Sequence, residues 1–291
     1  MQIDEQSRKG KCILKKLYAF SFMLSAFSNK KLYAFSFMLS AFSTTNVFAQ
    51  TWEAGAFGGA AGYVGDLNQR ALVKPSGPAV AVFVKRNFNP YLSLKLNLAY
   101  GKIAGADSVS NTQQFRDRNL SFHTQLTELS FISEFNFMKY TPGNLDGEHR
   151  FTPYVYFGAG VAKYDPQADY LGQTYDLRSR MTEGVAYPSK AIVIPYGAGV
   201  KYNFTNSWNI MFSAGYRYAR TDYLDDVSGL YADKSSFSDP VTTALSDRSG
   251  EHTGVYKGVA GTQRGDLRGH DNYLFMGITL SFTFVTSNCY Y

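Results

Sequence analysis

The chain is poor in cysteine, in charged residues and in long apolar runs. It has two cysteines, and after residue 49 only Cys289 remains, so the sequence predicts no disulfide within that part. Charged residues make up 18% of the 291 residues, a low share for a soluble globular domain. Beyond residue 49, no stretch has the roughly 18 consecutive apolar residues of a membrane-spanning helix. These shortages exclude a disulfide scaffold and a polytopic helical membrane protein.

The net positive charge is small outside the N-terminal segment. The formal net charge is +6, and residues 1–49 hold seven Lys and Arg against two Asp and Glu, or +5, which leaves +1 for residues 50–291. Binding to nucleic acid depends on many cations that neutralise phosphates. We therefore expect no nucleic-acid partner.

Arrangements typical of catalysis are also missing. The four histidines form no metal-binding pair at helical spacing, and no Gly-rich phosphate loop stands between a strand and a helix. His270 and Asp271 could form half of a hydrolytic site, but no nucleophile accompanies them. We predict no catalytic residues, no cofactor and no enzymatic activity.

The N-terminal 49 residues have the features of an export signal. Lys30 and Lys31 precede an apolar run over 32–43, and Val47, Phe48 and Ala49 form a small-x-small cleavage site. We expect cleavage between Ala49 and Gln50, with a signal peptide over 1–49 and a barrel domain over 50–291. The segment KKLYAFSFMLSAFS occurs at 15–28 and again at 30–43, which we interpret as a tandem duplication of the signal core.

The remaining chain alternates between apolar segments of period two and polar loops. The clearest segment is 92–101, where Leu94, Leu96, Leu98 and Tyr100 alternate with small or polar residues. Glycines blur the alternation in the first and fifth segments, so the facing of those two stays open. The pattern predicts eight strands, approximately over 51–64, 77–86, 92–101, 122–139, 152–164, 192–204, 208–218 and 274–284.

The lengths of the connections predict an orientation. The connections after the second, fourth and sixth segments are short, at roughly 4, 11 and 3 residues, and the others are long. Short periplasmic turns and long outer loops are typical of outer-membrane barrels. The expected fold is all-β, an eight-stranded antiparallel transmembrane β-barrel in contact with outer-membrane lipid.

A soluble barrel of the lipocalin type is the alternative, with its apolar face turned inward. The apolar faces carry more bulky Leu, Phe and Tyr side chains than a small lumen holds. The opposite faces are small or polar and carry charges of both signs, which can pair inside an eight-stranded barrel. These inward charges are expected at Glu53, Lys85, Lys95, Glu128, Glu134, Lys201 and Arg217.

An acidic segment follows the seventh expected strand. Asp222, Asp225 and Asp226 could supply oxygens to Ca²⁺ at the outer surface, or they could accept backbone N–H bonds and fold the loop. No spacing like that of an EF-hand accompanies them, which favours the loop-folding interpretation.

Several short motifs resemble the PorG-like outer-membrane barrels of Bacteroidota. They occur in the order and spacing of that family over nearly the whole chain after residue 49. They comprise Tyr63-Val64-Gly65-Asp66-Leu67, Tyr164-Asp165-Pro166-Gln167-Ala168, Tyr175-Asp176-Leu177, Thr221-Asp222-Tyr223-Leu224-Asp225-Asp226-Val227-Ser228, Gln263-Arg264-Gly265 and Asp271-Asn272-Tyr273.

This resemblance implies an accessory component of the type IX protein secretion system that associates with a periplasmic ring of a lipoprotein and its partner, PorK and PorN. The alternative is a small surface-binding barrel of the adhesin type, which acts through outer loops over 104–121, 165–189 and 221–270. Ring association should depend on the periplasmic segments 87–90, 140–150 and 285–291, whereas adhesion should depend on the outer loops.

Overall fold

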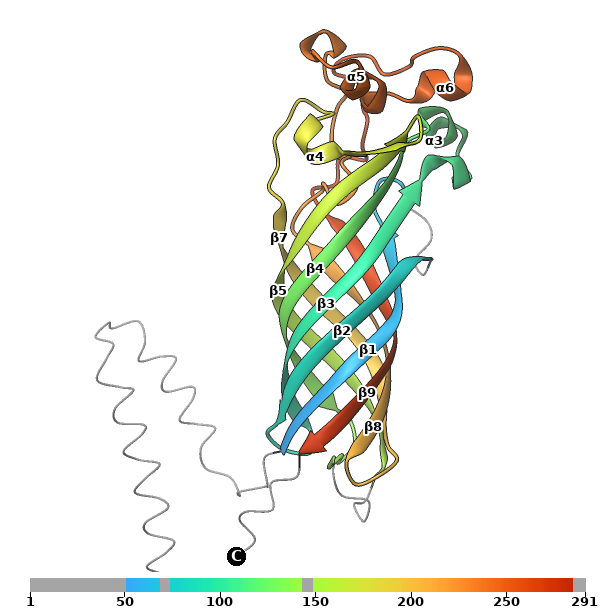
Figure 1. Cartoon of the computed structure of the whole chain (residues 1–291). Helices are drawn as coiled ribbons and strands as arrows, with labels where there is room; N and C mark the ends of the chain where they lie inside the picture. Colours follow the sequence, from blue (N-terminus) through green and yellow to red (C-terminus); the bar gives the residue numbers. More distant parts are fainter. Residues whose placement is uncertain (1–50, 69–73, 143–148, 285–291) are drawn as a thin grey trace, which may run out of the picture. The chain divides into compact units, whose positions relative to one another are not determined.

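Eight long antiparallel strands form a closed barrel in the computed structural model (Figure 1). The structure describes residues 51–68, 74–142 and 149–284; the expected signal peptide, its cleavage site and the segment 285–291 lie outside these ranges. Each strand pairs with its neighbours in sequence, and β1 pairs with β9 to close the ring. The strands are β1 (Thr51–Val64), β2 (Pro75–Asn87), β3 (Leu92–Ala106), β4 (Ser121–Asn136), β5 (Phe151–Tyr170), β7 (Lys190–Asn203), β8 (Trp208–Ala219) and β9 (Asp271–Phe284).

The predicted strand number, pairing and order are confirmed, and the main differences lie at the end with the long connections. There β3 continues to Ala106 and β5 to Tyr170, where a short strand β6 (Gln173–Asp176) pairs with it. The long connections also contain short helices that the sequence pattern did not predict: η1 (Asp107–Val109), α3 (Gln113–Arg118), α4 (Leu177–Arg180), η2 (Lys234–Ser236), α5 (Pro240–Ser246) and α6 (Ser249–Thr253). Among the described residues, no helix is both long and apolar enough to cross a membrane.

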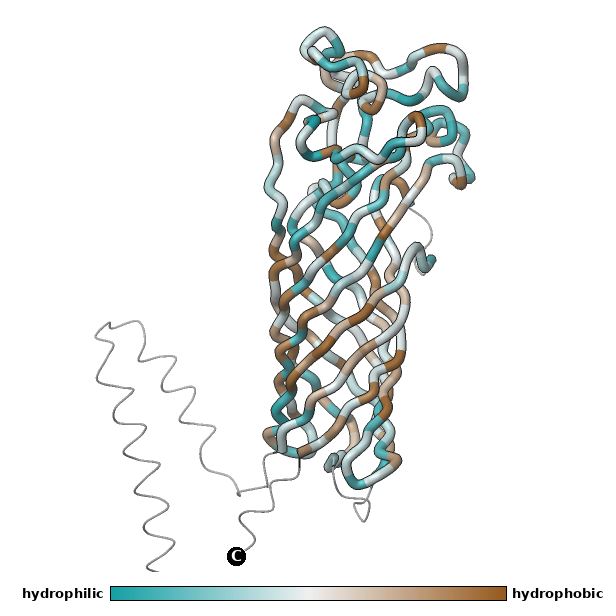
Figure 2. Tube along the Cα trace, viewed as in Figure 1, coloured by the Kyte–Doolittle hydropathy of each residue, from teal (hydrophilic) through white to brown (hydrophobic). Residues whose placement is uncertain are grey.

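Apolar and polar residues alternate along the strands (Figure 2). The apolar side chains are the exposed ones, so they lie on the outside of the barrel. On β3, Leu94, Leu96 and Leu98 are exposed, whereas Ser93 and Asn97, which alternate with them, are buried. A soluble barrel would have the opposite arrangement. The exposed apolar wall and the buried polar interior are the arrangement of a barrel that faces hydrocarbon.

The facing of β1 and β5, which the sequence left open, is decided by register. Glu53 of β1 pairs with Lys85 and Thr283, which both face inward, so Trp52 faces outward. On β5, Tyr154 and Tyr156 are buried. A Cβ at Gly197 would lie 2.6 Å from the Tyr156 hydroxyl, so glycine on the neighbouring strand makes room for that ring.

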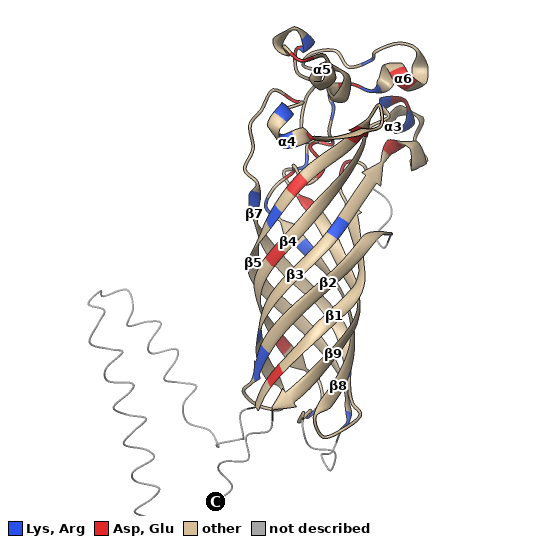
Figure 3. Ribbon diagram, viewed as in Figure 1, with Lys and Arg blue, Asp and Glu red and all other residues tan. Residues whose placement is uncertain are grey.

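Aromatic and charged residues mark the two edges of the apolar wall. Exposed aromatic side chains gather at the end where β1 begins: Trp52, Phe135, Phe151, Tyr202, Phe204, Trp208 and Phe284. At the other edge, outward cations follow directly after the last apolar positions: Lys102, Lys163, Lys190 and Arg220. Figure 3 shows that charged residues are sparse along the strands and dense in the loops beyond that edge. Aromatic girdles of this kind lie at the interfaces of membrane barrels.

One outward position of the predicted pattern is buried. Leu274 of β9 is only 3% exposed, although it alternates with inward residues. It lies opposite Gly62 and Tyr216 in the register, near the edge where the loops begin. The exposed apolar wall therefore stops below this position.

Candidate functional site

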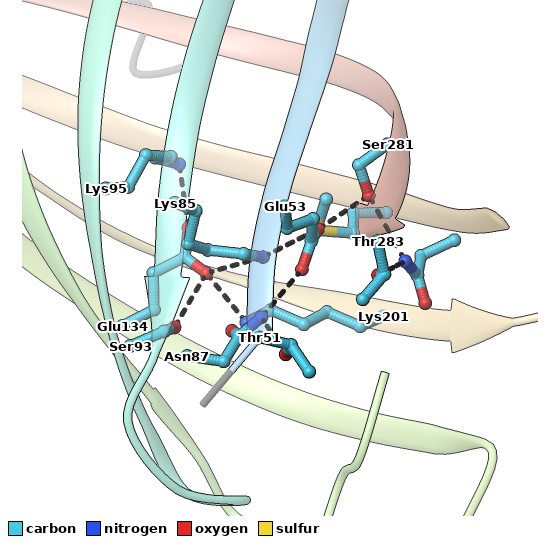
Figure 4. Close-up of polar contacts among 12 residues, drawn as sticks. Thr51, Glu53, Lys85, Asn87, Ser93, Lys95, Glu134, Lys201, Ser281 and Thr283 are labelled. Carbon is cyan, nitrogen blue, oxygen red and sulfur yellow. Dashed lines mark hydrogen bonds and ion pairs between the residues drawn. The ribbon is translucent and has the colours of Figure 1, made fainter. Parts of the chain in front are cut away.

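The lower lumen, at the end where β1 begins, is filled by a network of buried ion pairs (Figure 4). Glu134 of β4 lies 2.7 Å from Lys201, 2.8 Å from Lys95 and 3.4 Å from Lys85. Lys85 also lies 2.9 Å from Glu53, which accepts a hydrogen bond from Ser281. Two carboxylates and three ammonium groups, contributed by five strands, therefore hold the wall of the barrel together from within.

A second polar group occupies the lumen above this network. Glu128 accepts hydrogen bonds from Tyr273 at 2.7 Å and Ser130 at 2.6 Å, and it forms an ion pair with Arg217 at 3.4 Å. The Arg217 guanidinium also lies 4.3 Å from the centre of the Phe275 ring. Buried charges are tolerated when they are paired and hydrogen-bonded in this way.

The outer mouth of the barrel is plugged by the chain that follows β8. Leu224 is 0% exposed, and its carbonyl accepts a hydrogen bond from Thr124 on the inner wall at 2.6 Å. The Leu224 amide donates to Asp271, and the Tyr63 hydroxyl donates to Asp225 at 2.6 Å. Paired side chains therefore occupy the lumen, and this segment lies in its mouth, in the region the structure describes.

We expect such a barrel to form no steady pore. The purified protein in a planar lipid bilayer should give no stable open-channel current, in contrast to the large water-filled barrels of porins. A porin reconstituted in the same bilayer serves as the positive control. A steady current that scales with salt concentration would show that water fills the lumen instead of the ion pairs described above.

Above the mouth, a cap of outer loops is held by buried ion pairs. Arg264 lies 3.0 Å from Glu183 and donates to the Asp226 carbonyl at 2.7 Å. Arg118 holds Asp107 with two hydrogen bonds of 2.7 and 2.8 Å. The Arg264–Glu183 pair and a hydrogen bond from Arg118 to the Arg264 carbonyl join loops that are far apart in sequence, so the cap is a folded unit.

The motif residues singled out in the sequence meet at the outer end of the barrel. Tyr63, Asp225 and Asp271 share hydrogen bonds, and Leu67 and Ala168 are buried in the same apolar cluster as Leu224. Other motif residues have contacts of their own. The Gly65 backbone forms a β-bridge with Asn68, Asp165 lies 3.7 Å from Arg178, and Pro166 is buried. The Thr221 hydroxyl contacts the Tyr164 hydroxyl, and the Tyr223 ring stacks on the Tyr187 ring. Residues up to 208 positions apart therefore build one mouth.

The three aspartates considered for Ca²⁺ do not converge on one point. Asp225 accepts from Tyr63 and from the Val227 amide, and Asp226 accepts from Tyr187 and Thr182. The bond from the Val227 amide to Asp225 is of the backbone kind that the loop-folding interpretation expects, whereas Asp226 accepts from side-chain hydroxyls. Asp222 instead lies beside Asp66 and Asp266, which the sequence analysis did not connect with it because they belong to other loops.

Carboxylates crowd one side of the mouth. Burial raises the pKa of Asp222 to about 7. Burial, followed by repulsion from Asp225, raises the pKa of Asp66, and burial also raises the pKa of Asp225. Each shift disfavours the charged carboxylate, so nearby positive groups do not fully compensate this cluster.

The side chains of His270 and Asp271, considered as half of a hydrolytic site, contact different partners in the structure. The Asp271 carboxylate accepts hydrogen bonds from Tyr63 and from the Leu224 amide, and it is buried. The His270 ring instead packs against Tyr218, with ring centres 4.6 Å apart. This aspartate therefore supports the plug and is not paired with the histidine.

Comparison with known proteins yields a family and several similar structures. A family model described as a domain of unknown function, DUF6089, matches residues 30–240. The chain is similar to Neisserial surface protein A, with 11% identity over 82% of this chain and 100% of that one and a TM-score of 0.38. It is also similar to a major outer membrane protein from Thermus thermophilus, with 14% identity, 81% and 100% coverage and a TM-score of 0.39. The N-terminal β-barrel domain of Pseudomonas aeruginosa OprF shows 15% identity, 80% and 97% coverage and a TM-score of 0.34. No curated protein matches the chain.

Proposed function

This chain belongs to the DUF6089 family of domains of unknown function, and from that premise and the filled barrel we propose that it is a non-enzymatic structural component of the bacterial outer membrane. More specifically, it acts as an accessory barrel of type IX protein secretion. It sits in outer-membrane lipid and binds a periplasmic ring through its short turns and chain ends.

The filled lumen is the observation that carries this proposal. Glu134 alone contacts three lysines from three other strands, and Leu224 closes the mouth. A barrel of this kind offers no path through its centre for an exported protein. Its contribution to a secretion system would be structural: a rigid barrel in the membrane, with surfaces at its two ends that can bind other components.

The two ends differ in a way that supports contact with a periplasmic partner at the short end. The turns 88–91 and 204–207 are short, and the first described residue, Thr51, and the last, Phe284, lie at that same end. Of the expected contact segments 87–90, 140–150 and 285–291, residues 143–148 and 285–291 lie outside the described residues. The motifs that resemble PorG-like barrels support the choice of the secretion system and of PorK and PorN as the ring partners.

Copurification from outer membranes tests this function. A tagged barrel extracted in detergent should bring down the ring lipoprotein and its partner, identified by mass spectrometry. A short epitope inserted between Asn206 and Ser207, in a periplasmic turn, should abolish their recovery. The same epitope inserted between Gly254 and Val255, in the outer cap, is the matched control and should leave recovery unchanged.

A surface-binding function is the second candidate, and one feature of the cap favours it. Val255, Tyr256 and Val259 are all exposed on a loop of the cap, where apolar side chains gain nothing from hydrocarbon. Clustered exposed apolar residues are typical of interaction sites. Two results together would replace the first function by this one. The intact, abundant barrel would be purified without ring components, and the epitope in the cap would abolish adhesion of cells that carry the barrel on their surface.

A further inference from the structure

Three carboxylates from three different loops converge beside the outer mouth. Asp66 follows β1, Asp222 belongs to the segment after β8, and Asp266 precedes β9. One carboxylate oxygen from each residue lies within 4.8 Å of the corresponding oxygens of the other two. Twice the usual Ca²⁺–oxygen distance of about 2.3–2.6 Å gives about 4.6–5.2 Å, so these oxygens can share one coordination sphere of that size.

Asp66 supplies the second, independent observation. Its side chain is only 2% exposed. Its Oδ1 atom accepts a hydrogen bond from the Asp266 amide at 2.6 Å, but its Oδ2 atom is buried with no hydrogen-bond partner. An unpaired buried carboxylate oxygen is costly, and a buried charge is normally compensated by a cation or by hydrogen-bond donors.

Among the described residues, the two arginines beside this cluster bind other groups or extend into solvent. The Arg118 guanidinium binds Asp107 and two backbone carbonyls, one of them that of Asp66. Arg268 lies 3.3 Å from Asp266, but its own side chain is 70% exposed. Besides burial, repulsion from Asp225 and Asp266 raises the pKa of Asp66, so the charged form of this carboxylate lacks compensation from the protein.

We propose that Asp66, Asp222 and Asp266 bind one Ca²⁺ ion at the outer mouth of the barrel. The donors are all carboxylate oxygens, which suit a hard cation, and the cluster contains no histidine or cysteine of the kind that zinc prefers. Mg²⁺ fits less well, because it demands near-ideal octahedral geometry at about 2.0–2.1 Å and keeps most of its waters. Water molecules complete the six to eight oxygen ligands of Ca²⁺.

The ion would tie the plug to the barrel. Asp222 lies two residues before Leu224, the residue buried in the mouth, while Asp66 and Asp266 flank the strands that form the wall there. A cation shared by these loops would offset their mutual repulsion and fix the plug. The site does not depend on the proposed secretion function, because it concerns the outer end of the barrel only.

Calcium titration of the full-length barrel in detergent tests the site. After removal of metal with EDTA, isothermal calorimetry with CaCl₂ should give one site per chain with a Kd of about 0.1–1 mM, the range of extracellular calcium modules. MgCl₂ should bind at least about tenfold more weakly, because of its stricter geometry. Calcium should also protect the cap loops against proteolysis.

Asp66→Asn is the informative variant, because the amide keeps an oxygen for the Asp266 N–H but loses the charge. It should fold in EDTA and lose Ca²⁺ affinity by at least about tenfold, since the charge of the ligands sets that affinity. Asp169→Asn, at the outer rim with a side chain 69% exposed, is the matched control and should bind as the wild type does. Asp222→Asn provides a second variant if Asp66→Asn does not fold. Wild-type protein that binds no Ca²⁺ up to millimolar concentrations, or folded variants that bind it unchanged, would overturn the site.

Discussion

Replacing Glu134 with glutamine should destabilise the barrel by about 3–5 kcal/mol, the range found when one partner of a buried ion pair is removed. Glu134 contacts Lys85, Lys95 and Lys201 in the lumen, and its own side chain is 1% exposed. Glutamine has nearly the same shape but no charge, so three ammonium groups would face the single carboxylate of Glu53. The physical cause is the loss of compensation for charges that cannot reach water.

Equilibrium unfolding in urea from lipid vesicles measures this effect. Both tryptophans, Trp52 and Trp208, lie on the outward face near one edge of the wall, so their fluorescence reports on the transfer out of lipid. Lys201→Met in the Glu134→Gln background should recover part of the loss, because it removes one uncompensated cation. Glu251→Gln, a partly exposed carboxylate of the cap that pairs with Arg248, is the matched control and should change stability by less than about 0.5 kcal/mol. An unchanged unfolding midpoint for Glu134→Gln would mean that water reaches this network.

An arginine in the middle of the apolar wall should cost about 2–4 kcal/mol of stability in lipid. Leu96 of β3 is an exposed outward residue, and its partners in the register, Val84 and Phe131, are exposed and apolar as well. The guanidinium of Leu96→Arg would therefore lie in hydrocarbon, where its charge loses hydration. The same change on a soluble barrel would be nearly neutral, so the sign of the result distinguishes the two environments.

Tyr100→Arg is the control for position along the same strand. Tyr100 stands one outward position before Lys102, at the edge where cations begin, so an arginine there should cost only about 0–1 kcal/mol. The two variants should be compared by unfolding from lipid vesicles and by the yield of folded barrel after insertion. Equal stabilities of Leu96→Arg and the wild type would contradict a wall that faces hydrocarbon.

Strand existence and facing could be predicted wherever bulky residues alternate with polar ones. In β3 and β4 the alternation of Leu and Phe with Ser, Asn and Glu is a local property of a few consecutive residues, and the structure confirms it. The inward charges at Lys85, Glu128 and Glu134 follow from the same parity. The short helices were missed because segments of three to seven residues, such as α5, are too short for a helical period to be recognised.

The sequence by itself therefore determined the number of strands, their order, the facing of the regular ones and the closed barrel they form, because each depends on period two and on short connections. Tertiary structure alone decided the facing of β1, the plug at Leu224 and the convergence of Asp66 with Asp222 and Asp266. The physical reason is closure of the ring. Pairing of β1 with β9 brings loops from opposite ends of the chain to one mouth, and contacts at that distance leave no local pattern in the sequence.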